Sequence, residues 1–346
     1  MKLSLWVALL LLPASLMADT VSVNSTPAGI FTLNVAQSVD GTTPKLSVLS
    51  IPLVNDANVA GQVRGVITGV TSNTISNSGA GWTAGQLSSA SAPMFVRITS
   101  GTAIGRTFLV SSGTPNTSTA ATLTLSNTAD GTTDISTLGI VAGTDTYEIL
   151  AGYTLGTLLP SSVGVVGGSA PGSTTDLVQL FIGTSWIQFY YNTTSNAWLR
   201  AGNNANSNNV VIRPDTAVLY SRIGTSPISL VLTGSVPTTP AASVVANSGV
   251  SFLANTWPVN LTLGTSNINN IPGWTSNANP SQADLVQLLV GSSWIQFYYD
   301  GTQWRRAGTG AVSTNVSIPA GASIIVSKLA GNTGATTLTQ SIPYSL

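Results

Sequence analysis

Aspartate supplies most of the side chains in this sequence that could carry acid–base chemistry. The chain has no histidine and no cysteine, and Glu148 is its one glutamate. These absences exclude Ser-His-Asp and Cys-His nucleophiles, and also imidazole and thiolate metal ligands. A pair of carboxylates could still hydrolyse a glycosidic or peptide bond. Asp176 and Asp284 are the candidates for such a hydrolase, because they hold matching places in two similar segments.

The two segments are DLVQLFIGTSWIQFYY (176–191) and DLVQLLVGSSWIQFYY (284–299), which lie 108 residues apart and are identical at thirteen of sixteen positions. An aspartate that opens a strand is more often a turn residue or the partner of an arginine than a catalytic acid. The Asp-Gly-Thr stretches at 40–42, 130–132 and 300–302 are turn signals as well. We therefore predict that the protein is not an enzyme and needs no cofactor.

Calcium is the one metal that the sequence leaves open. The stretch NDANVAG (55–61) has part of the pattern of a calcium-binding loop. It lacks an acidic or amide residue at the third ligand position, and Ile67 stands where the terminal glutamate would be. We predict no metal-binding residues.

Aromatic residues are the best candidates for binding a partner. Along WIQFYY, the alternation of a strand sends Trp186, Gln188 and Tyr190 to one face and the residues between them to the other. This face, continued onto the next strand and repeated in the second segment, is a candidate for an exposed aromatic ladder. The candidate ligand- or partner-binding residues are Trp186, Gln188, Tyr190, Trp198, Arg200, Trp294, Gln296, Tyr298, Trp304 and Arg306.

Three interpretations of this ladder stay open. Flat rings beside amide and guanidinium groups suit sugar rings, and Trp, Tyr and Arg also favour protein interfaces. The simplest interpretation is that both faces are buried, one inside each domain and the other between domains or under a loop. Each Trp or Tyr would then bury roughly 150–250 Å² and anchor a core that has no disulfides.

The rest of the chain predicts an all-β protein. Short runs rich in Val, Ile, Thr and Leu, such as GIFTLNV (29–35) and SIIVSK (323–328), alternate with Gly, Asn, Ser and Pro clusters. The repeat covers roughly 154–237 and 262–343, where TLGT, NVVIRPDTAVLYSR (209–222) and LTGSVP (232–237) have counterparts. We interpret it as two tandem β-sandwich-like units.

The first unit is predicted to be interrupted. The second copy begins with SGVSFLANTWPVNL, and its best counterpart is LSVLSIPLVNDA (46–57), about 90 residues before the first TLGT. The predicted division is a signal peptide (1–18), a first unit (19–60 plus 151–237), an inserted small β module (61–150) and a second unit (238–346). The insert reads as a five-stranded, barrel-like module whose ends lie close together.

The N-terminus and the charge predict where the protein acts. Met1-Lys2, a run of about ten apolar residues and Ala18 form a secretory signal peptide, too short for a transmembrane helix. Charged residues make up 6% of the chain and balance at eleven of each sign. Without a basic patch, nucleic acid is a poor partner, and a near-zero net charge favours association.

The order of these segments, TPAGIFTLNV … SIPL … GVITGVTSNTIS … FVRITSGTAIGRTFLV … YTLGTLLP … DLVQL … LTGSVP, resembles an uncharacterised paralogous family of signal-peptide-bearing β proteins found in Verrucomicrobia. The resemblance spans nearly the whole mature chain. It implies export and β structure, and it carries over no activity and no functional residues.

We therefore expect a secreted or cell-surface, non-catalytic structural or interaction protein, with no transmembrane segment after signal cleavage. Its partner would be itself or another envelope protein. The alternative is a glycan-binding module that uses the aromatic ladder on a polysaccharide, and the third choice is the aspartate-dependent hydrolase.

Overall fold

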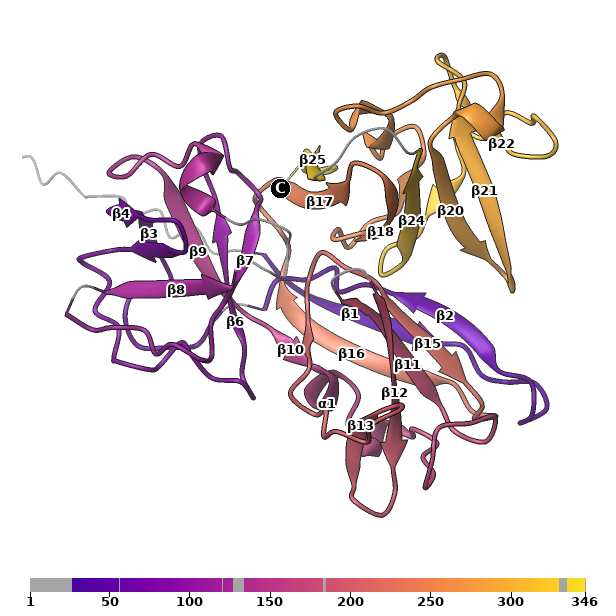
Figure 1. Cartoon of the computed structure of the whole chain (residues 1–346), viewed down its shortest axis with the longest axis horizontal. Helices are drawn as coiled ribbons and strands as arrows, with labels where there is room; N and C mark the ends of the chain where they lie inside the picture. Colours follow the sequence, from indigo (N-terminus) through magenta and orange to yellow (C-terminus); the bar gives the residue numbers. More distant parts are fainter. Residues whose placement is uncertain are drawn as a thin grey trace, which may run out of the picture.

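The all-β prediction is confirmed by a computed structural model of the chain, which describes residues 27–55, 57–119, 121–126, 134–182, 185–329 and 335–345. These residues form antiparallel strands with one short α-helix and a few 3₁₀ turns (Figure 1). The predicted signal peptide lies outside the described residues. No helix within the described ranges is long and apolar enough to cross a membrane.

The first repeat is the part of the chain that forms β1, β2 and β10 to β16. Its elements are β1 (Ala28–Val35), β2 (Lys45–Leu49), β10 (Tyr153–Thr154), α1 (Leu155–Leu158), η3 (Ser161–Val163), β11 (Leu177–Ile182), β12 (Ser185–Asn192), β13 (Ala197–Arg200), β14 (Val211–Ile212), β15 (Val218–Arg222) and β16 (Ile228–Ser235). Its five-stranded sheet has the order β13-β12-β11-β15-β2. A two-stranded ribbon of β1 and β16 forms the second layer, and β10 pairs with β14.

The core of the first repeat lies between the ribbon and the sheet. Alternate residues of β16 from Ile228 to Leu232 are buried, while Val231 between them is 64% exposed. The buried ones pack in one cluster with Val178 of β11 and Trp198 of β13. This period of two is why the ribbon has one apolar inner face and a separate outer face.

The second repeat has the same strand order. Its elements are β17 (Ala241–Ala246), β18 (Gly249–Ala254), β19 (Leu261–Thr262), η4 (Ile268–Asn270), η5 (Pro280–Gln282), β20 (Leu285–Val290), β21 (Ser293–Tyr299), β22 (Trp304–Arg306), β23 (Ser317–Ile318), β24 (Ser323–Lys328) and β25 (Ala335–Gln340). The sheet β18-β24-β20-β21-β22 matches the sheet of the first repeat strand for strand, and the pairs β17–β25 and β19–β23 match β1–β16 and β10–β14.

The inserted module is formed by the strands between β2 and β10. Its elements are β3 (Arg64–Val66), β4 (Gly69–Val70), β5 (Thr74–Ser76), β6 (Met94–Ile98), β7 (Thr107–Val110), β8 (Thr122–Ser126), η2 (Ile135–Leu138) and β9 (Thr146–Ala151). They form one sheet of seven strands in the order β3-β9-β6-β7-β8-β5-β4, around a core that includes Trp82, Phe108 and Tyr147.

The predicted five-stranded barrel is not confirmed, because this sheet is open. The stretch QVRGVITGV (62–70) has the pattern of a single strand in the sequence but forms two, since the chain leaves β9 after Val66 and joins β5 at Gly69. Strand β5 was missed. The two edge strands, β3 and β4, are joined by Ile67 and Thr68. The N–H of Ile67 donates to the carbonyl of Asp145, just before β9, and the N–H of Thr68 donates to the carbonyl of Ser76 in β5.

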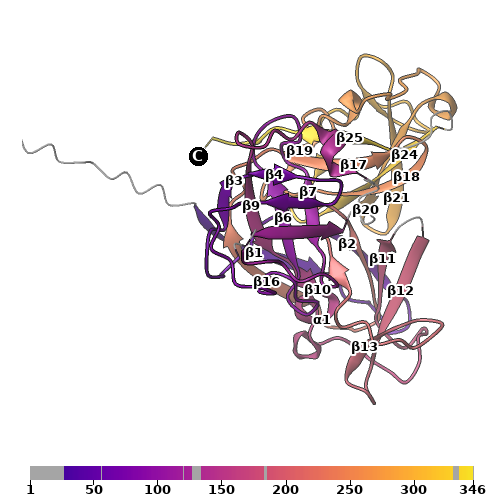
Figure 2. The same cartoon turned by 60° about the vertical axis from the view of Figure 1, so that its left-hand side comes forward.

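The two ends of the inserted module are adjacent. The N–H of Ala151 donates to the carbonyl of Asn55 at 2.7 Å, and the N–H of Ala57 donates to Ile149 at 3.4 Å. Figures 1 and 2 show the module beside the first repeat, with β17 and β25 of the second repeat next to it. The chain can therefore leave and rejoin the first repeat at one place.

The two repeats contact each other reciprocally. Ser50, just after β2, donates its N–H to Gly321 at 2.8 Å, and Ala254 at the end of β18 donates to Asp215 at 3.2 Å. The sequence repeat pairs Gly321 with Asp215. Ser50 and Ala254 correspond as well. Ser50 lies three residues after Ser47, and Ala254 lies three residues after Ser251. The hydroxyl of each of these two serines accepts a hydrogen bond from the N–H of an alanine. A contact in which each copy uses the same two places resembles an isologous dimer inside one chain.

Candidate functional site

Asp176, the first hydrolase candidate, is fully enclosed. Its exposed fraction is 0%, and its Oδ2 lies 2.7 Å from Nη1 of Arg222, which is 2% exposed. Oδ2 also accepts from the hydroxyl of Tyr220 at 2.8 Å and from the N–H of Val166, while Oδ1 accepts from the N–H of Ile223. Burial, together with this carboxylate, raises the pKa of Tyr220 above its ordinary value. Asp176 is thus the partner of an arginine, as its simpler interpretation expected.

Asp284 has the same place in the second repeat with fewer partners. It is 1% exposed and accepts from the N–H groups of Thr275 and Leu329, both at 2.8 Å. Lys328 replaces the arginine there and donates to the carbonyl of Pro272 at 3.0 Å. The two aspartates precede strands of separate sheets, β11 and β20, and each bonds to its own partners, so they do not form a carboxylate pair.

The other described carboxylates also bond within the protein. Glu148 is 3% exposed and is shared by Arg97 and Arg64, whose Nε atoms lie 2.5 Å and 3.3 Å from its oxygens. Hydrogen bonds from protein groups reach the carboxylates of Asp40, Asp134, Asp145, Asp176, Asp215, Asp284, Asp300 and Glu148. Asp40 and Asp300 sit in turns as predicted, and the Asp-Gly-Thr stretch at 130–132 lies outside the described residues.

No group of three or more possible metal ligands occurs among the described residues. Asp56, at the centre of the stretch considered as a calcium loop, is not described. Asn55 and Gly61 lie at the start of the inserted module, where Gly61 adopts φ 89°.

The register of β12 and β13 divides the predicted ladder. Trp198 stands opposite Tyr191, and Leu199 stands opposite Tyr190. Trp198 therefore shares the core face with Tyr191 rather than the face of Trp186, so its predicted place in the ladder is wrong. It is 1% exposed, packs edge-on against Tyr191 with ring centroids 5.8 Å apart, and donates Nε1–H to the carbonyl of Leu159.

The second repeat makes the same division. Trp304 stands opposite Tyr299 and is 1% exposed, with ring centroids 5.6 Å apart. The error has one cause in both copies: the loop before the third strand sets which of its residues faces the core, and the sequence did not fix that register. Arg200 and Arg306 pair with Phe189 and Phe297, so their predicted place on the ladder face is wrong as well; both are exposed.

The remaining ladder residues do share a face in each repeat. Trp186, Gln188 and Tyr190 alternate along β12, and Trp294, Gln296 and Tyr298 alternate along β21. Tyr190 and Tyr298 are 1% and 5% exposed, whereas Trp186 is 38% exposed. Gln188 and Trp294 are half-buried, and Gln296 is exposed. These faces are neither fully buried nor an open platform.

The first ladder contacts the second repeat. The ring centroids of Trp186 and Phe252 of β18 are 4.3 Å apart, and Phe181 lies 5.5 Å and 4.9 Å from these two rings. Lys45 of β2 donates to the hydroxyl of Ser292, in the turn between β20 and β21, at 2.7 Å. The ladder face is therefore partly used to hold the two repeats together.

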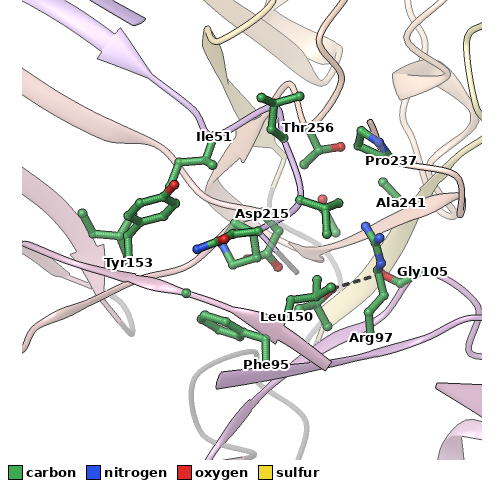
Figure 3. Close-up of a pocket in the computed structure, with 18 of the residues that line it drawn as sticks. Ile51, Phe95, Arg97, Gly105, Leu150, Tyr153, Asp215, Pro237, Ala241 and Thr256 are labelled. Atoms are coloured by element: carbon green, nitrogen blue, oxygen red, sulfur yellow. Dashed lines mark hydrogen bonds between the residues drawn. The ribbon is translucent and has the colours of Figure 1, made fainter. Parts of the chain in front are cut away.

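Two cavities accompany these surfaces. A cleft of about 300 Å³ is lined by Trp198 and Tyr191 with polar neighbours that include Thr157, Ser161, Asn196 and Asn208. A smaller cavity of about 60 Å³ lies where the first repeat, the inserted module and the second repeat meet, and we call it the junction cavity (Figure 3). Its residues come from distant stretches of sequence, so no local pattern could have found it.

The titrating groups predict a wide plateau of stability in pH. Backbone and side-chain hydrogen bonds from Thr43 and Thr42 hold the pKa of Asp40 well below 3.8, and hydrogen bonds from Arg305 and Gln303 do the same for Asp300. A lowered carboxyl pKa contributes stability above the ordinary pKa, which is lost as pH falls through the folded value. Burial raises the pKa of Tyr344 to about 12. Its contribution is complete below pH 10 and is lost as pH rises towards 12.

We therefore expect the melting temperature to change little between about pH 5 and pH 9 and to fall outside that window. Differential scanning calorimetry across buffers of equal ionic strength tests this. A steep loss between pH 7 and pH 5 would contradict it, since the chain has no histidine to titrate there.

No family model, curated protein or solved structure matches this chain. Its function has to be inferred from its own residues and geometry.

Proposed function

We propose that this chain is an exported, non-catalytic structural or interaction protein that associates with copies of itself through the outer face of the β1–β16 ribbon. The observation that carries the proposal is the exposure of two large apolar side chains on that face. Ile30 is 75% exposed and Val231 is 64% exposed. Their outward neighbours are small or polar and uncharged: Ala28, Thr32, Asn34, Ser229 and Thr233.

In the second repeat, the ribbon that corresponds to β1–β16 already has a neighbour. The inserted module contacts this ribbon: the N–H of Ala242 of β17 donates to the carbonyl of Gly105 at 3.3 Å, and Nη1 of Arg106 lies 3.4 Å from the hydroxyl of Thr337 of β25. In the first repeat, the same side of the ribbon has Ile30 and Val231 open to solvent. A face without charge has no like-charge repulsion to prevent pairing with its own copy.

Sedimentation across a concentration series tests self-association. We expect the wild-type chain to form species larger than a monomer, and Ile30→Lys with Val231→Lys to weaken the association at least about tenfold, because two copies would bring like charges together. Val141→Lys is the matched control, since Val141 is 55% exposed on the inserted module. A wild-type chain that stays monomeric at high concentration and is missing from envelope fractions would refute the proposal.

The glycan-binding alternative is best supported by the 300 Å³ cleft, because Trp198 and Tyr191 line it among amide and hydroxyl groups. Both rings are almost fully buried, so this cleft offers a sugar polar groups rather than a flat aromatic surface. Titrating polysaccharides against tryptophan fluorescence tests it. A response that is lost on Asn196→Ala would favour the cleft, whereas one lost on Trp186→Ala with Trp294→Ala would favour the ladder.

A further inference from the structure

We propose that the junction cavity binds a small carboxylate with a short apolar body, and that Arg97 recognises its carboxylate group. This binding site goes beyond self-association and does not depend on it. The walls of the cavity are mainly apolar and come from all three parts of the chain, including Ile51 of the first repeat, Phe95 and Leu150 of the inserted module, and Trp257 of the second repeat. Apolar walls with a few polar groups are typical of small-ligand sites.

Arg97 is the polar group best placed for a ligand. It is 8% exposed, and Figure 3 shows its guanidinium directed towards Pro237 and Ala241. Its Nε bonds to Glu148 at 2.5 Å, and that is its single hydrogen bond among the described residues. The two terminal nitrogens are therefore held in place without a described partner, and a guanidinium binds a carboxylate in a planar, two-bonded geometry.

The charges around the cavity favour an anion. Glu148 is shared between Arg97 and Arg64, so one negative charge is balanced against two positive charges. Asp215 also lines the cavity, but both of its oxygens bond to Arg213, at 3.0 Å and 3.1 Å. Asp215 is therefore occupied by its own counter-ion. A guanidinium with vacant donors at the wall of an apolar cavity gains most from a charged acceptor, because a charge-assisted pair is stronger than a bond to a neutral group.

The volume limits the ligand. A water molecule needs roughly 10–15 Å³ of comparable space, so a cavity of about 60 Å³ holds roughly four waters or one ligand of about five non-hydrogen atoms. Propionate has this size. Its two carbons beyond the carboxylate would lie against the apolar wall, while the hydroxyl of Thr256, which is buried without a partner among the described residues, offers a further hydrogen bond.

Titration of the full chain with [1-¹³C]propionate, followed by ¹³C NMR, tests the proposal. We expect saturable one-to-one binding in the millimolar range, as suits a ligand of this size. Propionamide, a neutral molecule of the same shape, should bind at least about tenfold more weakly because it forms no charge-assisted pair.

Two variants locate the site. Ala241→Leu fills the cavity beside Arg97 and should weaken propionate binding at least about tenfold, and Arg97→Lys should weaken it about fivefold by removing the planar fork while keeping the charge beside Glu148. Ala170→Leu, at an exposed position outside the cavity, is the control and should bind as the wild type does. Absence of saturation, equal binding of propionamide, or unchanged binding by Ala241→Leu would each overturn the assignment.

Discussion

Replacing Asp176 with alanine is expected to lower the free energy of unfolding by about 3–5 kcal/mol, because the change leaves a buried charge without its partner. Arg222 is 2% exposed and would keep its guanidinium away from water with no carboxylate beside it. The N–H groups of Val166 and Ile223 would also lose their acceptor. Each such unsatisfied buried group costs about 1–3 kcal/mol.

Urea denaturation followed by tryptophan fluorescence measures this loss, and the second repeat supplies its control. Asp284→Ala removes an equally buried carboxylate whose described partners are two backbone N–H groups and no arginine. We expect that variant to lose about 1–3 kcal/mol, less than Asp176→Ala.

A double variant separates the buried charge from simple loss of packing. If the uncompensated guanidinium is the cause, Asp176→Ala with Arg222→Met should be more stable than Asp176→Ala alone, because methionine needs no counter-ion. A double variant that is less stable than both single variants would contradict this account.

The role of Asp176 could be anticipated from its residue type, because a buried aspartate is almost always paired. An aspartate at the start of a strand, followed 46 residues later by Arg222 on the neighbouring strand, needs no long-range information beyond the pairing of β11 with β15. The same holds for the strands themselves. Alternation in β16 and the apolar stretch of β11 are visible in the residues, so the all-β fold followed from them.

Register and closure were harder to predict. A shift of one residue in the register of β13 moves Trp198 from one face of the sheet to the other. The six residues 192–197, which precede Trp198, do not indicate which register the strand adopts. The barrel-like module was not confirmed for a related reason. Val66 and Gly69 belong to one continuous stretch, and whether its halves pair with one neighbour or two depends on the position of β5, which has only three residues.

Contacts between parts of the chain lay beyond the sequence altogether. Arg97 and Ala241 line one cavity although 144 positions separate them in the chain. The reciprocal contacts of Ser50 and Ala254 depend on how the repeats are docked. Composition could indicate that buried aromatics exist, but only the docking shows that Phe252 meets Trp186.

The buried tryptophans of the two repeats form a pair that differs in one hydrogen bond and in one ring contact, since Trp304 also packs 5.8 Å from the ring of Trp274. Trp198 and Trp304 are each 1% exposed and pack edge-on against an equivalent tyrosine. Nε1 of Trp198 donates to Leu159 at 2.8 Å, whereas Nε1 of Trp304 is buried with no partner among the described residues. Truncation of either to alanine should cost about 3–5 kcal/mol of unfolding free energy.

Substitution by phenylalanine isolates the hydrogen bond. Both changes leave a similar void. Trp198→Phe also leaves the buried carbonyl of Leu159 without its donor, whereas Trp304→Phe removes an Nε1–H that has no acceptor among the described residues. We expect Trp198→Phe to be the more destabilising by about 1–3 kcal/mol in urea denaturation. Trp186→Phe is the control at a 38% exposed position and should change stability by less than either. Equal losses at Trp198 and Trp304 would mean that packing against the tyrosines, rather than the bond to Leu159, determines what the first repeat gains from its tryptophan.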